Sequence, residues 1–342
     1  MTSKGSSREI SAEIHRTHGL RGGSDGLERI LRITSACNQR CPFCFVLATG
    51  KAVDTADIER ALDALVESGA RSQEITISGG EPTADPRLPR IIELARQKGF
   101  RRFALQTNGV FLARPGLMEA LVKLGVRTYM VSFHSHKPGF YDRITGSRRQ
   151  YRLAVAGLSR LIHSGRCRVC VNIVVNEWNY RDLPGLAGFI GGLSADIPRR
   201  RRPSVFFSMI NDSGHDKAPS WAVDLSRVAP FLRRAVERCR RESIRVHRFM
   251  GESSFPVCLL SRPARYAPLG SFPQERIRYF EGIRPDPGAV GRVKRSSCRR
   301  CPYDSRCPGV SARYADLFGL GALSPERGSL PHICTMRDEV DP

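Results

Sequence analysis

The chain has 342 residues, of which 55 are Lys or Arg and 33 are Asp or Glu, so its formal net charge is +22. With 41% hydrophobic residues, the composition is that of a folded globular protein and excludes a fibrous or wholly disordered chain. The length suggests two domains. No apolar run approaches the roughly 20 residues that a membrane-spanning helix needs.

The first 26 residues are polar and rich in Gly and Ser, without the apolar stretch of a signal peptide. We therefore expect a flexible tail over 1–26 and a cytoplasmic protein that does not contact a membrane. In a reducing compartment, the 11 cysteines are expected to be metal ligands or buried thiols and not a disulfide framework.

The positive charge has two interpretations. It indicates an acidic partner such as RNA, or it reflects a preference for Arg, which supplies 48 of the 55 basic residues against 7 Lys. The Arg residues are spread along the chain, and the densest run, 199–202, is that of a solvated loop. This spread favours the second interpretation and leaves nucleic acid as a weakly supported partner.

From residue 27 onward, strand-like and helical segments alternate. Short apolar runs, typical of strands buried on both faces, occur at 27–34, 74–78, 102–107, 128–133, 168–175 and 204–210. Segments with helical periodicity, several of them ending at a Gly, occur at 54–68, 88–97, 117–124, 151–164, 180–192 and 221–241. Since strands that alternate with helices form parallel sheets, the pattern predicts an α/β fold with a (β/α)6 partial TIM barrel over 27–215.

Beyond residue 215 the pattern changes. After the helical segment at 221–241, the stretch 251–291 is rich in Pro, Gly and Arg and has little periodicity, and it leads into a cysteine-rich run. We expect 216–342 to form a small irregular domain that is held together by something other than a large apolar core.

Cys37, Cys41 and Cys44 form a C-x3-C-x2-C motif directly after the first expected strand. Three thiolates within eight residues can hold one inorganic centre, and thiolates suit iron–sulfur clusters. In a four-iron cluster, three cysteines leave one iron open to a cofactor or substrate. The alternatives are buried thiols or a zinc site, although a structural zinc site takes four ligands and no fourth lies close in sequence.

This motif and its surroundings resemble the signature of the radical S-adenosylmethionine (radical SAM) enzymes, in which an aromatic residue, here Phe43, precedes the last cysteine. A second motif at the end of the second strand resembles the family's GGEP motif, which cradles the methionine amino group of the cofactor: Gly79, Gly80, Glu81 and Pro82. Glycines let a backbone approach a ligand closely, and Glu81 supplies negative charge near an ammonium group.

The resemblance implies further contacts with the cofactor at the ends of later strands, from Ser132, His134 and Asn172. The family's common Ser-x-Asp is Ser-Phe-His here, so the role of His134 is open, and His134 with His136 could instead be a metal pair. Asn172 and Asn176 contact the cofactor or cap the end of their strand. The backbone at 207–209 could face the adenine.

A second cysteine group, Cys298, Cys301 and Cys307, has C-x2-C-x5-C spacing. Its position after the barrel resembles the auxiliary-cluster domains called SPASM, or their shortened twitch form. We predict one auxiliary [4Fe–4S] cluster with Cys258 as the fourth ligand and Cys334 as its rival, and whether the cluster keeps an open iron is undecided. Zinc or free thiols are the alternatives.

The resemblance implies an enzyme that cleaves S-adenosylmethionine reductively to a 5′-deoxyadenosyl radical, which abstracts a hydrogen atom from the substrate. Its cofactors would be a [4Fe–4S] cluster on the first three cysteines, S-adenosylmethionine and the auxiliary cluster. Its partners would be a reducing protein of the flavodoxin or ferredoxin type and a precursor peptide presented by a separate recognition protein, because we favour a peptide-modifying maturase.

Two other functions are compatible with the sequence. The first is a radical SAM enzyme acting on a small molecule or an RNA base, since we expect the 26 residues before the barrel to be too short for a peptide-binding domain. The second is a non-catalytic, zinc-binding nucleic-acid protein, although a zinc module has no need of a methionine cradle. The remaining cysteines, Cys167, Cys170 and Cys239, show no ligand pattern, and Cys239 is expected in the core.

Overall fold

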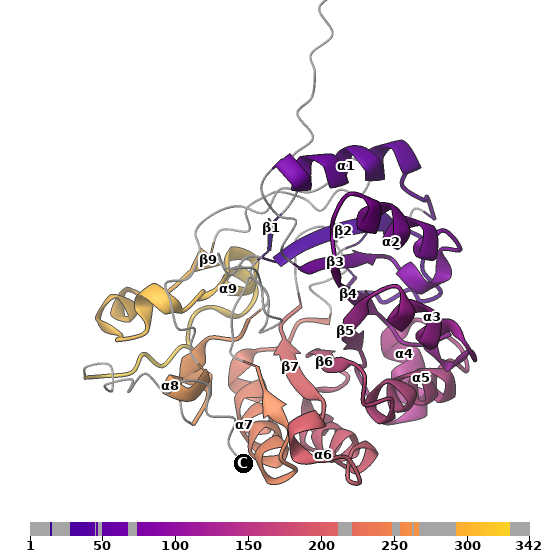
Figure 1. The fold of residues 1–342 in the computed structure, drawn as a ribbon. Coiled ribbons are helices and arrows are strands. Elements are labelled where there is room, and N and C mark those ends of the chain that lie inside the picture. Colours follow the sequence, from indigo (N-terminus) through magenta and orange to yellow (C-terminus); the bar gives the residue numbers. More distant parts are fainter. Residues whose placement is uncertain are drawn as a thin grey trace, which may run out of the picture.

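A computed structural model describes residues 14–15, 28–44, 46, 50–67, 74–210, 221–247, 254–261, 263–266 and 292–328. Its centre is one sheet with strand order β1 to β8, in which β1 is antiparallel to β2 and every later neighbour is parallel. The sheet curves into a partial barrel (Figure 1). Its strands are β1 (Ile14–His15), β2 (Glu28–Thr34), β3 (Glu74–Gly79), β4 (Arg102–Thr107), β5 (Val126–Ser132), β6 (Arg168–Val174), β7 (Ser204–Ser208) and β8 (Arg245–Val246).

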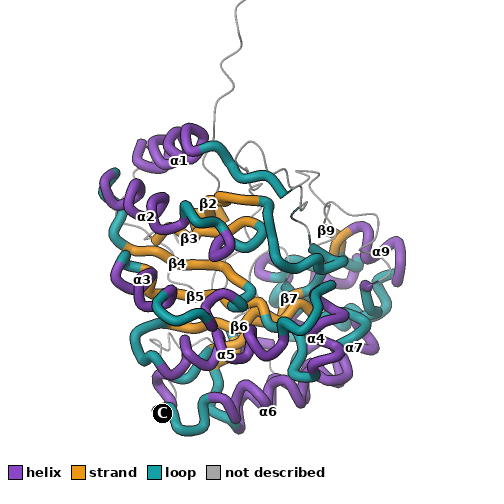
Figure 2. The backbone as a smooth tube through the Cα atoms, turned by 90° about the vertical axis from the view of Figure 1, so that its right-hand side faces the viewer, coloured by secondary structure: helices purple, strands orange, loops and turns teal. Residues whose placement is uncertain are grey.

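Helices connect successive parallel strands and cover the outer face of the sheet (Figures 1 and 2). They are α1 (Thr55–Glu67), α2 (Leu88–Gln97), α3 (Leu117–Lys123), α4 (Pro138–Thr145), α5 (Tyr151–His163), α6 (Leu183–Leu193) and α7 (Leu225–Arg241). Their packing follows from spacing, as in α1, where Ile58, Leu62 and Leu65 recur on one face and are buried.

The two faces of the sheet differ in chemistry because side chains alternate along each strand. On β3, Ile75 and Ile77 belong to the large apolar core shared with the helices. Between and after them, Thr76 and Ser78 point to the inner face, where the Ser78 hydroxyl donates to Gln106 Oε1 of β4 at 2.8 Å. The inside of the barrel therefore offers polar groups.

The expected α/β partial barrel is confirmed, and each of the six expected strands is present with ends shifted by at most two residues. Three features differ from the expectation. β1 lies inside the expected tail 1–26, and helix α4 was not predicted. The sheet also continues past residue 215, because α7 leads into β8, which pairs with β7. The unit that we expected to end at 215 thus extends to the end of β8.

The C-terminal part of the described chain consists of short elements. They are α8 (Pro263–Tyr266), α9 (Ala312–Phe318), the antiparallel pair β9 (Arg292–Val293) and β10 (Val310–Ser311), and 3-10 helices at Val257–Leu259, Ser296–Arg300 and Asp304–Arg306. Two hydrogen bonds tie them to α7: Leu225 N donates to the Tyr314 hydroxyl at 2.9 Å, and Arg233 Nε donates to Leu259 O at 2.7 Å. Among the described residues, none of the helices has the length and apolarity to cross a membrane.

Candidate functional site

The loop that carries Cys37, Cys41 and Cys44 leaves the carboxyl end of β2 and is fixed by hydrogen bonds to helix α4 and to the loop after β4. Gln39 Nε2 donates to the Tyr141 hydroxyl at 2.9 Å, and Asn38 accepts from Asn108 Nδ2 at 2.7 Å. The loop thus occupies the edge of the sheet where parallel-barrel proteins place their chemistry.

The three thiols are half-buried and close enough to interact: Cys44 raises the pKa of Cys37, and both of them raise the pKa of Cys41. Burial raises the pKa of Cys37 to about 11, and burial also raises the pKa of Cys41 and Cys44. The positive charge of the Arg32 guanidinium opposes this rise in the pKa of Cys44. Three thiolates in such a place need a cationic group for charge balance, and the iron–sulfide core of a cluster supplies it. The residues present therefore fit the group that the sequence predicts.

Gly79 and Gly80 hold the end of β3 against the start of this loop. Gly80 N donates to Thr34 O at 2.7 Å, and Glu81 N donates to Ala36 O at 2.8 Å. A Cβ on Gly80 would lie 2.3 Å from Ala36 O, and one on Gly79 would lie 2.3 Å from Thr34 O. The close approach that these glycines allow is thus made to the chain's own backbone, next to the cysteines.

Glu81 is fully buried, and both of its carboxylate oxygens accept hydrogen bonds from the protein. Oε1 accepts from Thr83 N at 3.0 Å, from the Thr83 hydroxyl and from the Thr107 hydroxyl at 2.6 Å, while Oε2 accepts from Asn108 N at 2.6 Å. Burial raises its pKa, and these donors oppose the rise. Glu81 therefore joins the loops after β3 and β4, and Pro82 begins the 3-10 turn that it caps.

The other predicted cofactor contacts lie at the carboxyl ends of β5 and β6. Ser132 pairs with Asn172 across the two strands, and Asn172 Oδ1 accepts from the Ser208 hydroxyl at 3.0 Å. His134 is buried; its Nδ1 accepts from Val174 N at 3.2 Å, and burial lowers its pKa to about 4. His134 is therefore neutral at physiological pH.

The ring of His134 contacts the cysteine loop directly. It lies edge-on to Phe43, with 5.4 Å between ring centroids. No group of three or more His, Cys, Asp or Glu side chains within the described part of the chain is placed to hold a single metal ion, so His134 and His136 gain no third ligand there. The side chain of Phe207 belongs to the apolar core, and Cys239 lies in this core as predicted. The Asn176 side chain donates to Val174 O, two residues before it.

Four cysteines of the C-terminal part line one cavity: Cys258, Cys298, Cys301 and Cys307. The empty space between its lining atoms, which includes its opening to solvent, is about 330 Å³. Burial, with a smaller contribution from the other three thiols, raises the pKa of Cys258 to about 11. Cys334 lies outside the described residues.

Backbone groups around this cavity point at the sulfurs. Gly309 N donates to Cys307 Sγ at 3.4 Å, and the backbone of Val257 and of Ser324 donates to Cys307 and Cys258 respectively. Gly309 has a φ of +69°, and a Cβ there would lie 2.4 Å from Val293 O, so this turn requires glycine. Ser311, where a full SPASM domain has a further cysteine, caps α9 by accepting from Tyr314 N at 3.0 Å.

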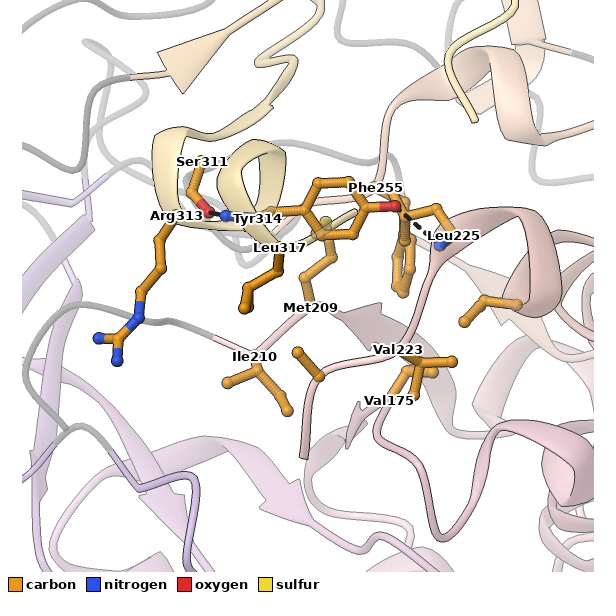
Figure 3. A pocket seen from close by; sticks show the side chains of 12 residues that line it. Val175, Met209, Ile210, Val223, Leu225, Phe255, Ser311, Arg313, Tyr314 and Leu317 are labelled. Carbon is orange, nitrogen blue, oxygen red and sulfur yellow. Dashed lines mark hydrogen bonds between the residues drawn. The ribbon is translucent and has the colours of Figure 1, made fainter. Parts of the chain in front are cut away.

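A second cavity lies between α9 and the carboxyl ends of β6 and β7 (Figure 3). It is partly open to solvent, and its lining is mainly apolar, with Val175, Met209, Ile210, Val223, Phe255 and Leu317. Arg313 is the charged residue of the lining, and its side chain extends away from the apolar ones (Figure 3). Ligands of parallel α/β proteins bind at this edge of the sheet, and apolar cavities with few polar groups are typical binding sites.

Sequence reasoning missed the residues that support the cysteine loop from a distance. Thr145, at the end of the unpredicted helix α4, accepts from Arg40 N at 2.8 Å and lies 3.8 Å from Cys41 Sγ. Gln150 exchanges two hydrogen bonds with Asn38. No motif marks these residues, because they follow the cysteines by more than 100 positions.

Comparison with known proteins also indicates the radical SAM enzymes. Residues 31–190 match the family model described as "Radical SAM superfamily". A probable GTP 3′,8-cyclase from Methanococcus vannielii is 31% identical over 157 residues, which are 45% of this chain and 51% of the relative. The PqqA peptide cyclase of Bradyrhizobium diazoefficiens is 31% identical over 173 residues, which are 49% of this chain and 44% of the relative.

The fold has a counterpart among solved structures. The crystal structure of Streptococcus suis SuiB bound to precursor peptide SuiA aligns with a TM-score of 0.51 at 16% identity, over 90% of this chain and 75% of that one. At this identity the likeness concerns the fold alone.

The partial barrel, the three-cysteine loop and the family match define the class: the chain contains a domain of the radical SAM superfamily, whose members use a [4Fe–4S] cluster and S-adenosylmethionine. The curated relatives named above are enzymes, and the chain spans about half the length of each.

Proposed function

We propose that this protein is a radical SAM enzyme that modifies a peptide or protein substrate and carries an auxiliary [4Fe–4S] cluster. The observation that carries the proposal is the fixed position of Cys37, Cys41 and Cys44 beside the turn of Gly79, Gly80 and Glu81. The chemistry that a bound cluster and S-adenosylmethionine supply is one-electron cleavage of the sulfonium bond, which yields a carbon radical able to remove a hydrogen atom from the substrate.

The chain's own residues orient this chemistry. The three thiolates would hold three irons and leave the fourth for the cofactor's amino and carboxylate groups. Glu81 keeps the loops after β3 and β4 together through the Thr83, Thr107 and Asn108 donors. Ser132 and Asn172, at the inner carboxyl edge of β5 and β6, are suited to hydrogen-bond the cofactor's ribose or carboxylate.

The auxiliary cluster is supported by the cavity that Cys258, Cys298, Cys301 and Cys307 line. Four thiolates can ligate all four irons, so we propose a closed cluster that exchanges electrons and leaves substrate binding to other groups. The backbone donors to Cys258 and Cys307 would tune its potential, since hydrogen bonds to the sulfurs do so in such clusters.

A peptide substrate is supported by the apolar lining of the cavity between α9 and the carboxyl ends of β6 and β7, which suits contact with apolar side chains. The relationship to a peptide cyclase points the same way. The relationship to a GTP cyclase favours a second candidate, an enzyme acting on a small molecule. A flanking gene for a short precursor peptide, and a mass change in that peptide on coexpression, would separate the two.

The cysteine assignments are tested by anaerobic reconstitution. The full chain should take up about eight irons, two clusters of four, and with dithionite it should convert S-adenosylmethionine to 5′-deoxyadenosine. Joint replacement of Cys37, Cys41 and Cys44 by Ala should abolish this product and leave about four irons, while Cys239→Ala, a core thiol, serves as the matched control. A chain that binds zinc instead of iron and leaves S-adenosylmethionine intact would disprove the proposal.

A further inference from the structure

Helix α4, the loop that follows it, the first turn of α5 and the cysteine loop together carry a group of exposed basic residues. Together with the exposed ring of Phe140 they form what we term the α4 surface: Arg40, Phe140, Arg143, Arg148, Arg149 and Arg152. Within the described residues, no carboxylate forms an ion pair with any of these five arginines; Asp142, the acid between them in sequence, accepts from the backbone N of Arg149. Their charge is therefore available to a partner.

The α4 surface lies directly outside the three-cysteine loop. Arg40 is the residue before Cys41, and its backbone N donates to Thr145 O, the last residue of α4, at 2.8 Å. Cys41 Sγ lies 3.8 Å from the same carbonyl oxygen. Gly146, the next residue, is exposed. Solvent on this side is thus separated from Cys41 by little more than one peptide unit.

A row of aromatic rings makes a second link between the α4 surface and the cysteine loop. Phe140, 38% exposed, lies 6.3 Å from Trp178; Trp178 lies 5.6 Å from Trp221; and Trp221 lies 6.4 Å from Phe43, between Cys41 and Cys44 (all centroid distances). The Arg143 guanidinium covers the Trp178 ring. An exposed aromatic residue ringed by charge is typical of protein interfaces.

We propose that the α4 surface is the docking site for a small acidic electron-transfer protein that reduces the cluster held by Cys37, Cys41 and Cys44. The step transfers one electron: the reduced flavin or iron–sulfur group of the partner is oxidised by one electron, the cluster is reduced by one, and no covalent bond changes. The inference rests on the proposed function, because it needs that cluster.

An electron carrier fits the α4 surface better than RNA does. Charge complementarity would bind either partner, but closeness to Cys41 matters only to a partner that exchanges electrons. The basic residues also belong to α4, the loop after it, the first turn of α5 and one position of the cysteine loop, which form a compact area and not an extended track.

The test uses the reconstituted full chain and a bacterial flavodoxin as the probe. Joint Arg143→Glu, Arg148→Glu and Arg149→Glu replacement should weaken flavodoxin binding, measured by calorimetry at low salt, at least tenfold. The control reverses the charge of three exposed basic residues elsewhere on the barrel, Arg90, Arg101 and Lys123, and should change the affinity less than threefold. Because none of the replaced side chains is buried, both proteins should fold.

Stopped-flow reduction of the cluster gives a second measurement. Flavodoxin hydroquinone should reduce the α4-surface variant at least tenfold more slowly than the parent, and dithionite, which needs no docking site, should reduce both at the same rate. If dithionite fails to reduce the parent, the proposed function is wrong. If dithionite succeeds and the variant still binds flavodoxin like the parent, the docking proposal is wrong. The docking proposal is also wrong if the variant loses affinity for a single-stranded RNA and keeps its affinity for flavodoxin.

Discussion

The two cysteine sites of this protein are built in opposite ways. In the barrel, backbone hydrogen bonds from Gly80 and Glu81 and the buried carboxylate of Glu81 fix the cysteine loop to a sheet with its own large core. In the C-terminal part, 3-10 helices and two-residue strands surround the cavity of Cys258, Cys298, Cys301 and Cys307. The first site is held by the fold. The second has so little regular structure that we expect its bound group to hold the fold.

The largest effect expected from this difference follows removal of iron. A chelator should raise amide exchange by at least about tenfold at 254–260 and 296–309, because these segments lose their ligand-mediated links, and leave β3 to β5 unchanged. Exchange measured by mass spectrometry on the reconstituted and stripped chain checks this. Cys258→Ser should reproduce the C-terminal opening, and an equal rise in the barrel would refute the comparison.

A smaller effect is expected from Gly80→Ala, which tests the rigidity of the first site. The new Cβ would meet Ala36 O at 2.3 Å, and both groups are backbone, so the turn must shift. We expect a loss of about 3 kcal/mol in the free energy of unfolding, the upper end for overpacking, measured by urea denaturation. Gly192→Ala, where no atom lies within 4 Å, is the matched control and should not destabilise the helix.

The smallest effect is expected from Glu81→Gln. The carboxylate accepts from two backbone N–H groups, those of Thr83 and Asn108, one at each oxygen. An amide has one oxygen, so one of these N–H groups would face the amide NH2. The unfolding free energy should fall by about 1–3 kcal/mol, whereas Glu59→Gln, on the exposed side of α1, should leave it unchanged. Equal stability of both variants would show that Glu81 does not join the loops.

The sequence predicted the barrel well because its signals are local. Each of the six expected strands is a short apolar run between helical segments, and burial on both faces makes such runs recognisable. The sequence did not predict helix α4, because this helix has only eight residues and begins with Pro138 and Gly139. The sequence did not predict strand β8 either, because two residues show no periodicity and the place of β8 in the sheet depends on its pairing with β7.

For the candidate sites, too, the sequence predicted features that depend on neighbouring residues and missed those that depend on distant ones. The spacing within one loop predicts Cys37, Cys41 and Cys44 as ligands, and the structure places this loop against the turn of Gly79, Gly80 and Glu81. The hydrogen bonds of the Glu81 carboxylate could not be predicted, because its partners Thr107 and Asn108 lie at the end of another strand. His134 was assigned to the cofactor from its position, and the structure adds its contact with Phe43.

The sequence by itself determined the superfamily and the parallel order of the strands, and it singled out three cysteines after the first of them, because each depends on residues close together in the chain. It favoured Cys258 over Cys334 as the partner of the later cysteines, and the tertiary structure places Cys258, 40 positions before Cys298, in their cavity. Only the tertiary structure decided that the carboxyl end of α4, which carries Thr145, lies against Cys41. Both arrangements depend on contacts between distant segments, which exist only once the helices have packed on the sheet.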